Sequence, residues 1–367
     1  MSQTEVQLIK SSSVVDGDIV GMSSSKLSGA LPAISGASLT NLPQQAGVNK
    51  NLIINGDMQI AQRGTSASVS VSNLGYKTVD RFRFQDHGSP TGVYTMSQSS
   101  DHPDGFSKGL RFATTTADTM AAGDATYVDY QIESQDLQQL AYGTSSAKTL
   151  TLSFHVKGTI TGTYVVWIYS PDTLKALTKT YTISAQNVWE KKTITIPGDT
   201  ATALGNDTDS GFMIRWILGT GTDYTSGTAY STWNALALSP IANRYVGQTA
   251  NVLATTSDNW NLAGVQLELG DEATDFEYRS VGEQLELCKR YFQKIDQTLY
   301  GCRYSTSSGF VHHFHNPEMR AEPAFNWTGR ATSSGWNYAS YSNKKTFQVI
   351  MTAQSPYIQG GTWDAEL

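Results

Sequence analysis

The stretch "KTLTLSFHVKG", Lys148–Gly158, decides the fold class. Apolar residues occupy every second position, and polar residues lie between them. Because successive side chains of a β-strand point to opposite faces of a sheet, this period of two predicts a strand with one buried face. We expect Leu150, Leu152, Phe154 and Val156 to point inward, and Thr149, Thr151, Ser153 and His155 to point outward.

Segments on both sides of this strand repeat the pattern. "VDRFRFQ" places Phe82 and Phe84 on one face and Arg81 and Arg83 on the other, and "TYVVWIYS", "GFMIRWIL" and "AGVQLELG" also read as strands. Turn-forming clusters such as "KGTITG" and "IPGD" separate these runs. Many short strands with regular breaks predict an all-β protein, with a jelly-roll β-sandwich over residues 49–280.

The composition narrows the function classes. Charged residues make up 16% of the 367 residues, below the roughly 25% of an average globular protein, and the net charge is −6. An acidic chain lacks the basic face that phosphate binding needs, so we expect no nucleic-acid partner. No run of about 20 apolar residues occurs, and the first residues do not resemble a signal peptide, so we expect no membrane insertion.

The period of the sequence changes near residue 281. In "VGEQLELCKRYFQKI", Leu285, Cys288, Phe292 and Ile295 recur at intervals of three and four residues. This spacing predicts a linking amphipathic helix over residues 281–295, followed by a small C-terminal β domain over 296–367. Cys288 and Cys302 are the two cysteines of the chain, and they can either pair or stay reduced.

The leader, residues 1–48, combines low charge with regularly spaced apolar residues. Glycine and proline interrupt any helix in "SSSKLSGALPAISGASLTNLP", Ser23–Pro43. A thin segment of this kind can bury apolar side chains only against other copies of the chain or a groove on a larger assembly; the alternative is a floppy polar leader. The residues predicted to make this attachment are Leu27, Leu31, Ile34, Leu39 and Leu42.

Several stretches resemble one group of proteins. "NLIINGDMQIAQRG" at Asn51–Gly64, "DRF" at Asp80–Phe82 and the block "GVQLELGDEATDFEYRSVGEQLELCKRYFQK" at Gly264–Lys294 resemble the carbohydrate-binding-module-like jelly roll of bacteriophage tail fibres and related virion proteins. "MRAEPAF" at Met319–Phe325 and the ending "DAEL" are similar to tail-fibre tip domains. "KLSGALPAISGASLTNLP" resembles the thin segments that precede such domains in trimeric fibres.

The resemblance implies a homotrimer that is assembled in the host cytoplasm and carried on the virion. Residues 1–48 would attach it to other phage tail or capsid proteins, and the β domains would face a bacterial surface glycan. The function so implied is adsorption to the host, by polysaccharide binding. Two alternatives stay open: a structural adaptor or capsid-decoration fibre without sugar binding, and a polysaccharide depolymerase.

Motifs of enzyme chemistry are absent from the sequence. It contains no G-x-S-x-G, H-E-x-x-H, P-loop or C-x-x-C pattern, so we expect no enzyme. Two carboxylates for sugar hydrolysis can come from distant strands, which keeps the depolymerase alternative open.

Sugar binding calls for an aromatic platform with polar groups at its rim. The loop "GTGTDYTSGTAYSTWN" and the strand "TYVVWIYS" supply the candidates, although most tryptophans of a β-sandwich belong to its core. The candidates are Tyr224, Tyr230 and Trp233 in the loop, Trp167 and Tyr169 in the strand, and Trp327, Trp336, Tyr338, Tyr341 and Trp363 at the C-terminal tip.

Two weak metal signals remain. On a strand, His313 and His315 would share one side, and three chains around an axis would offer six imidazoles to a transition metal. Asp207 and Asp209 in "DTDSG" resemble half a calcium loop. The alternatives are surface histidines and a solvated turn. We expect no cofactor, with a structural calcium or an axial transition metal as open options.

Overall fold

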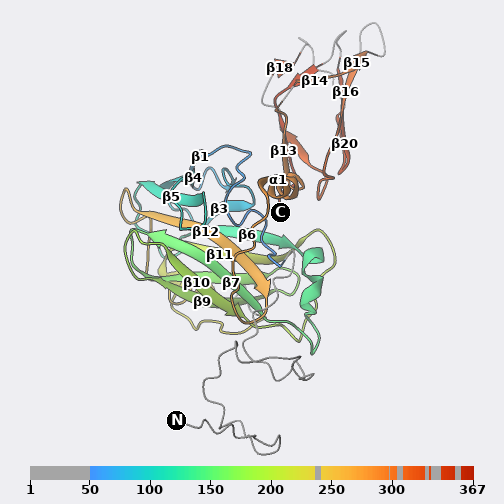
Figure 1. Ribbon diagram of the computed structural model, residues 1–367. Helices are drawn as coiled ribbons and strands as arrows, with labels where there is room; N and C mark the ends of the chain where they lie inside the picture. The colour runs from blue at the N-terminus through green and yellow to red at the C-terminus, as the bar shows by residue number, and fades with distance from the viewer. Residues whose placement is uncertain are drawn as a thin grey trace, which may run out of the picture. The chain divides into compact units, whose positions relative to one another are not determined.

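The computed structural model describes residues 50–235, 241–296, 298–303, 309–326, 330–331, 340–351 and 357–367 (Figure 1). All of them belong to one compact unit, Ala46–Leu367. The leader and its five attachment candidates lie outside the described residues. No helix among the described residues is long and apolar enough to cross a membrane.

Two six-stranded sheets form a β-sandwich, and every pairing between their strands is antiparallel. Sheet 1 has the order β1 (Ser66–Val69), β4 (Val93–Ser99), β5 (Gly109–Thr116), β12 (Asn259–Leu269), β7 (Leu150–Gly158), β10 (Glu190–Ile196). Sheet 2 has the order β2 (Gly75–Tyr76), β3 (Phe82–His87), β6 (Ala125–Glu133), β11 (Ser210–Thr220), β8 (Gly162–Ser170), β9 (Lys175–Ile183). The late strands β11 and β12 each lie between early strands, which is the Greek-key feature of a jelly roll (Figure 1).

The core lies between the two sheets and follows the predicted alternation. Leu150, Leu152, Phe154 and Val156 are fully buried and share one cluster with Phe82, Phe84, Trp216 and Trp260. The other face of β7 differs from the prediction, because Thr151 and Ser153 are also buried. The segment that follows β12 packs on this face: the Thr151 hydroxyl donates to the carbonyl of Gly270 at 2.9 Å.

Helix α1 (Val281–Lys289) confirms a helix at the predicted start but not its predicted length. The side chain of Ser280 caps it by accepting the Glu283 N–H at 3.2 Å. The prediction that the helix reaches Ile295 is wrong, because Phe292 begins strand β13 (Phe292–Lys294). The backbone of β13 pairs with β22 (Thr362–Asp364) instead, so its polar groups need no further helical turn.

The described residues of the C-terminal part form three small sheets, which agrees with the small β domain predicted from the sequence. Its core is a cluster that includes Ile295, Val311, Phe347 and Trp363. The sheets are β13–β22–β17 (Ala324–Asn326), β14 (Thr298–Tyr300)–β21 (Tyr357–Gln359)–β18 (Arg330–Ala331), and β15 (Cys302–Arg303)–β16 (Gly309–Phe314)–β20 (Thr346–Met351)–β19 (Ser340–Ser342).

Candidate functional site

A row of polar and aromatic residues crosses the outer face of sheet 2. These residues alternate with core residues along their strands, so they point away from the sandwich interior. Register places them directly opposite one another across five strands, from β3 to β9. We call the row the outer ladder: Arg83, Asp129, Arg215, Trp167 and Thr178.

Ion pairs organise the outer ladder. Asp129 is fully buried, and its carboxylate faces a guanidinium on each side. Arg83 Nη2 lies 3.1 Å from Asp129 Oδ2, and Arg215 Nε lies 3.4 Å from the same oxygen. A buried carboxylate would be costly without such partners.

Beyond Arg215, aromatic rings lie on the outer face of sheet 2. Trp167 and Tyr169 share it, as predicted, and their rings stack with centroids 5.1 Å apart and planes 17° apart. The guanidinium of Arg215 lies 4.4 Å from the centre of the Tyr127 ring and 5.1 Å from that of Trp167. The Tyr169 hydroxyl is neutral at pH 7 and can both donate and accept hydrogen bonds, and burial raises its pKa further.

The three aromatic candidates of the loop have packing partners. Tyr224 and Tyr230 are buried, at 1% and 8% exposure, and Tyr224 joins the cluster that contains Trp167. Trp233 is partly exposed but packs against the main core, and its Nε1–H donates to the carbonyl of Pro197 at 2.7 Å. These rings hold the loop to the sandwich. Of the strand candidates, Trp167 is 1% exposed and Tyr169 is partly exposed.

The charged members of the outer ladder are not among the site residues predicted from the sequence. Their signal was present: in "GFMIRWIL" the outward positions are Met213 and Arg215, and an arginine in an otherwise apolar strand calls for a partner. Asp129 supplies this partner from the outward positions of "TYVDYQIE". Only the strand order, which the local pattern does not encode, brings the two residues together.

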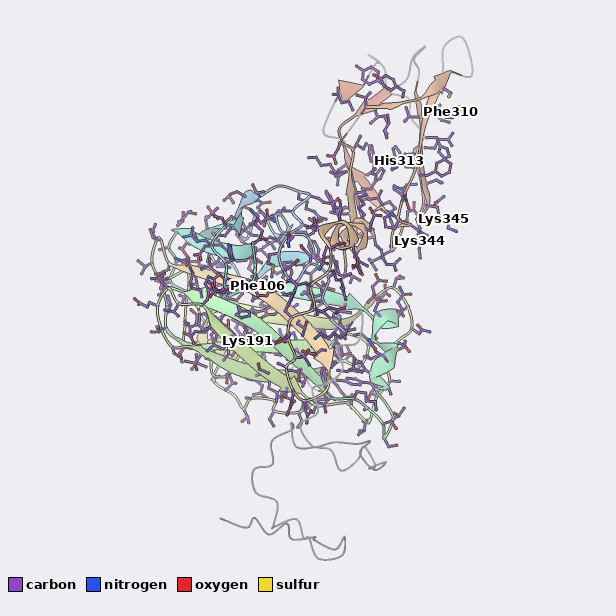
Figure 2. The ribbon with its side chains drawn as sticks, viewed as in Figure 1. Phe106, Lys191, Phe310, His313, Lys344 and Lys345 are labelled. Atoms are coloured by element: carbon purple, nitrogen blue, oxygen red, sulfur yellow. The ribbon has the colours of Figure 1, made fainter. Side chains whose placement is uncertain are left out.

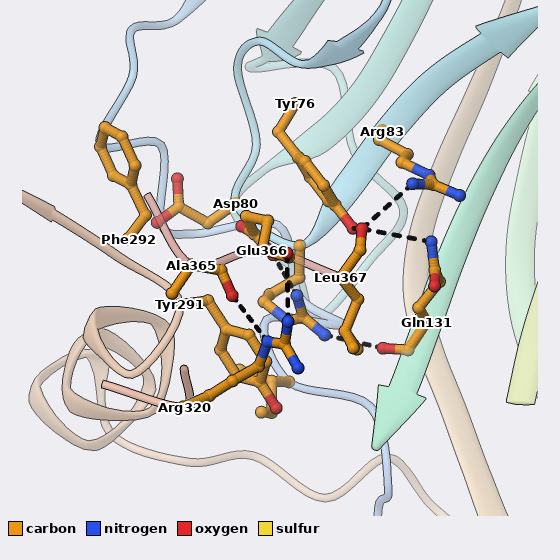
Figure 3. A network of polar contacts seen from close by, with 12 residues as sticks. Tyr76, Asp80, Arg83, Gln131, Tyr291, Phe292, Arg320, Ala365, Glu366 and Leu367 are labelled. Atoms are coloured by element: carbon orange, nitrogen blue, oxygen red, sulfur yellow. Dashed lines mark hydrogen bonds and ion pairs between the residues drawn. The ribbon is translucent and has the colours of Figure 1, made fainter. Parts of the chain in front are cut away.

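A short C-terminal segment covers the β3 end of the outer ladder (Figure 3). We call Asp364–Leu367, the "DAEL" ending, the tail clasp. Arg83 Nη1 donates to the backbone oxygen of Leu367 at 3.0 Å, and the Tyr76 hydroxyl donates to the same oxygen at 3.3 Å. Arg81 pairs with Glu366, and Arg63 Nη2 lies 3.0 Å from Asp364 Oδ2. The partly exposed section of the outer face is therefore centred on Arg215 and Tyr169.

The metal candidates do not form a metal site within one chain. No group of three or more His, Cys, Asp or Glu side chains among the described residues could hold an ion. His313 and His315 do lie together, with ring centroids 5.4 Å apart, but both rings pack on Trp363. Asp207 Oδ1 accepts the N–H of Asp209 at 3.0 Å, as in a simple turn. The two options for a bound metal stay predictions.

The remaining candidates lie in the C-terminal part. Trp363 is 1% exposed and belongs to the core of this part, so it is no surface aromatic. Cys288 and Cys302 are both free thiols, the first buried and the second exposed. Trp327, Trp336 and Tyr338 lie outside the described residues, as does the side chain of Tyr341.

Comparison with known proteins yields no family model and no curated relative that matches. Solved structures with a similar fold include the enzymatically active domain of tailspike protein 4 of bacteriophage CBA120, at 12% identity and a TM-score of 0.31. The match covers 60% of this chain and 22% of the tailspike chain. A family 4 carbohydrate-binding module matches at 16% identity and a TM-score of 0.29, over 59% of this chain and 98% of the module. A family 11 module from a Clostridium thermocellum cellulase matches at 13% identity and a TM-score of 0.27, over 60% and 96%.

Proposed function

We propose that the chain is a non-enzymatic virion fibre protein that binds a bacterial surface glycan through Arg215 and Tyr169 on the outer face of sheet 2. One observation carries the proposal: the stacked pair Trp167–Tyr169 adjoins an Arg–Asp–Arg set, with two partly exposed arginines and a buried carboxylate, on one sheet face. A sugar ring needs a flat apolar surface on one side and hydrogen-bond partners at its edge. Tyr169 offers the surface, and the guanidinium of Arg215 offers donors to hydroxyls.

The fixed geometry of this face favours binding. Arg215 is held by Asp129 and by the rings of Tyr127 and Trp167, so little side-chain freedom remains to be lost when a ligand binds. Arg215 and Tyr169 are each only partly exposed, which suits weak binding at one site. In the homotrimer that we propose, several copies on one virion would convert weak single contacts into firm attachment.

A glycan array with the purified full chain tests the proposal. We expect binding to at least one host-derived polysaccharide, and we expect Tyr169→Ala to weaken it at least tenfold, equivalent to about 1.4 kcal/mol. Tyr278→Ala is the matched control, because Tyr278 is an aromatic residue, 57% exposed, that packs with Phe106 over β12 of sheet 1. Equal losses in both variants would contradict the assignment of the site.

The same preparation separates the alternatives. Absence of binding to every host polysaccharide would favour the structural adaptor or capsid-decoration fibre. The strong burial of Trp167 and Tyr224, which keeps these rings from a ligand, also favours this alternative. Release of reducing ends from the polysaccharide would instead identify a depolymerase. Gold labelling of the C-terminal part on intact virions would locate the chain, and we expect the label at the tail end.

A further inference from the structure

A cavity of about 680 Å³ lies beside α1, away from the outer ladder. Leu285 and Lys289 of α1 form one side of it. Ile295 and Trp363 contribute from the C-terminal part, together with His313, which Figure 2 labels on β16. This volume falls within the range of pockets that hold small molecules in proteins. Nothing in the proposed function uses this cavity.

The walls of the cavity are held in place by packing. Trp363 is 1% exposed, and the rings of Phe325 and Phe347 contact it with centroids 5.6 Å and 5.4 Å away. The imidazole of His313 lies flat on Trp363, with centroids 4.5 Å apart and planes 5° apart. A ligand would therefore meet a formed surface and would not have to order the residues that bind it.

The charges of the cavity are already matched. Lys289 Nζ lies 2.7 Å from Glu286 Oε1, and Lys294 Nζ lies 3.7 Å from Asp296 Oδ1. Burial and the neighbouring His312 lower the pKa of His313, so its imidazole is neutral at pH 7. These pairs leave no unpaired lysine at the cavity to favour an anionic ligand.

The uncharged groups of the cavity fit sugar hydroxyls. The amide of Asn316 is exposed at the cavity and can both donate and accept hydrogen bonds. Gln62 and Gln293 line it with side-chain oxygens that can accept, because their N–H groups already donate within the chain. Leu285 and Ile295 add apolar surface for the C–H face of a sugar ring. We propose that this cavity is a second carbohydrate site, which takes a short uncharged oligosaccharide. This proposal does not depend on the outer ladder, so either of the two proposed sites can be disproved without affecting the other.

The test follows the imidazole signals of the full chain by NMR during titration with maltotriose, cellotriose, chitotriose and, as an acidic probe, trigalacturonate. We expect at least one neutral trisaccharide to shift the signal of His313. The ring of His312 does not line the cavity but contacts Phe314, which does, so the His312 signal should move less than that of His313. Trigalacturonate should bind at least tenfold more weakly at this site.

Two tryptophan substitutions on α1 provide the matched pair. Leu285→Trp places bulk in the cavity and should weaken the effective trisaccharide at least tenfold. Val281→Trp, one turn earlier on the same helix, is the control, because Val281 is 53% exposed and does not line the cavity. Tyr169→Ala should leave this binding unchanged, which separates the cavity from the outer ladder.

Three results would overturn the proposal. The first is that none of the neutral trisaccharides moves the His313 signal. The second is that Leu285→Trp binds the effective trisaccharide as well as Val281→Trp does. The third is that dilution alone shifts the His313 signal without sugar, which would mean that a second copy of the chain covers the cavity.

Discussion

Removing the Glu366 carboxylate should strongly destabilise the protein, because it leaves a buried charge without a partner. The side chains of Arg81 and Glu366 are 1% and 4% exposed and form an ion pair. Arg81 also donates to the carbonyl of Gln131 at 2.7 Å, and its guanidinium lies 3.4 Å from the centre of the Tyr291 ring. Arginine cannot lose its proton, so in Glu366→Ala the charge remains in the fold.

The expected loss is about 3–5 kcal/mol of unfolding free energy, the usual cost of removing one member of a buried pair. Each kcal/mol lowers the melting temperature by about 2–4 °C in a domain of this size class, so the melting temperature should fall by at least about 6 °C. Urea unfolding followed by tryptophan fluorescence measures the free energy. Glu318→Ala is the control: it breaks the exposed pair with Lys345, at 3.7 Å, and should cost below about 1 kcal/mol.

A double substitution tests the reason for the loss. Arg81→Met combined with Glu366→Leu removes both charges and keeps apolar bulk, so it should recover most of the stability that Glu366→Ala loses. A loss below about 1 kcal/mol in Glu366→Ala would refute the reasoning, because the Arg81 charge would then have found water. Failure of the double substitution to recover stability would show that the tail clasp acts through packing and not through charge.

Burial raises the pKa of Asp80 to about 6. The contribution of Asp80 to the stability of the fold is therefore complete below pH 4 and is lost as the pH rises through 6. In thermal melts between pH 4 and 7, Asp80→Asn should remove this fall in stability with pH. Burial and a neighbouring imidazole lower the pKa of His315 to about 4, so its contribution is present above pH 6.5 and is lost as the pH falls through 4. His315→Gln should make the C-terminal part less sensitive to acid, measured by amide hydrogen exchange. Gly264 has φ +59°, and a Cβ there would lie 2.4 Å from Phe106 Cζ, so Gly264→Ala should cost about 1–3 kcal/mol in urea unfolding. Gly282→Ala, a helical position with open space, should instead stabilise by about 0.5–1 kcal/mol.

The sequence predicts the strands well because their signal is local. Alternation alone identifies the inward residues of β7, such as Phe154, which is fully buried. Alternation cannot identify Thr151 as buried, because the segment that packs on it, around Gly270, lies more than 100 positions away in the sequence. The end of α1 is missed for a similar reason: the spacing of Phe292 fits a helix, but pairing with β22 decides its backbone.

The candidate site is only partly accessible to sequence reasoning. Residue type and alternation place Trp167 and Tyr169 on one face, and the structure confirms that placement. Composition gives no measure of burial, so Tyr224 reads like a loop aromatic on the surface although it is 1% exposed. The partnership of Asp129 with Arg215 depends on strand order, which is a property of the whole sandwich.

The central positions of β11 and β12 have a consequence for folding kinetics. Strands β6 and β8 flank β11, and β5 and β7 flank β12, so residues 82–183 alone would leave both sheets with a gap in the middle. Pairings of high sequence separation close slowly, because the entropy of loop closure is lost before the contacts form. Until residues 210–269 insert, the open edges of four strands can pair with other chains. Fragments that end before residue 259 should therefore aggregate, and refolding of the full chain should be slow and most efficient at low concentration.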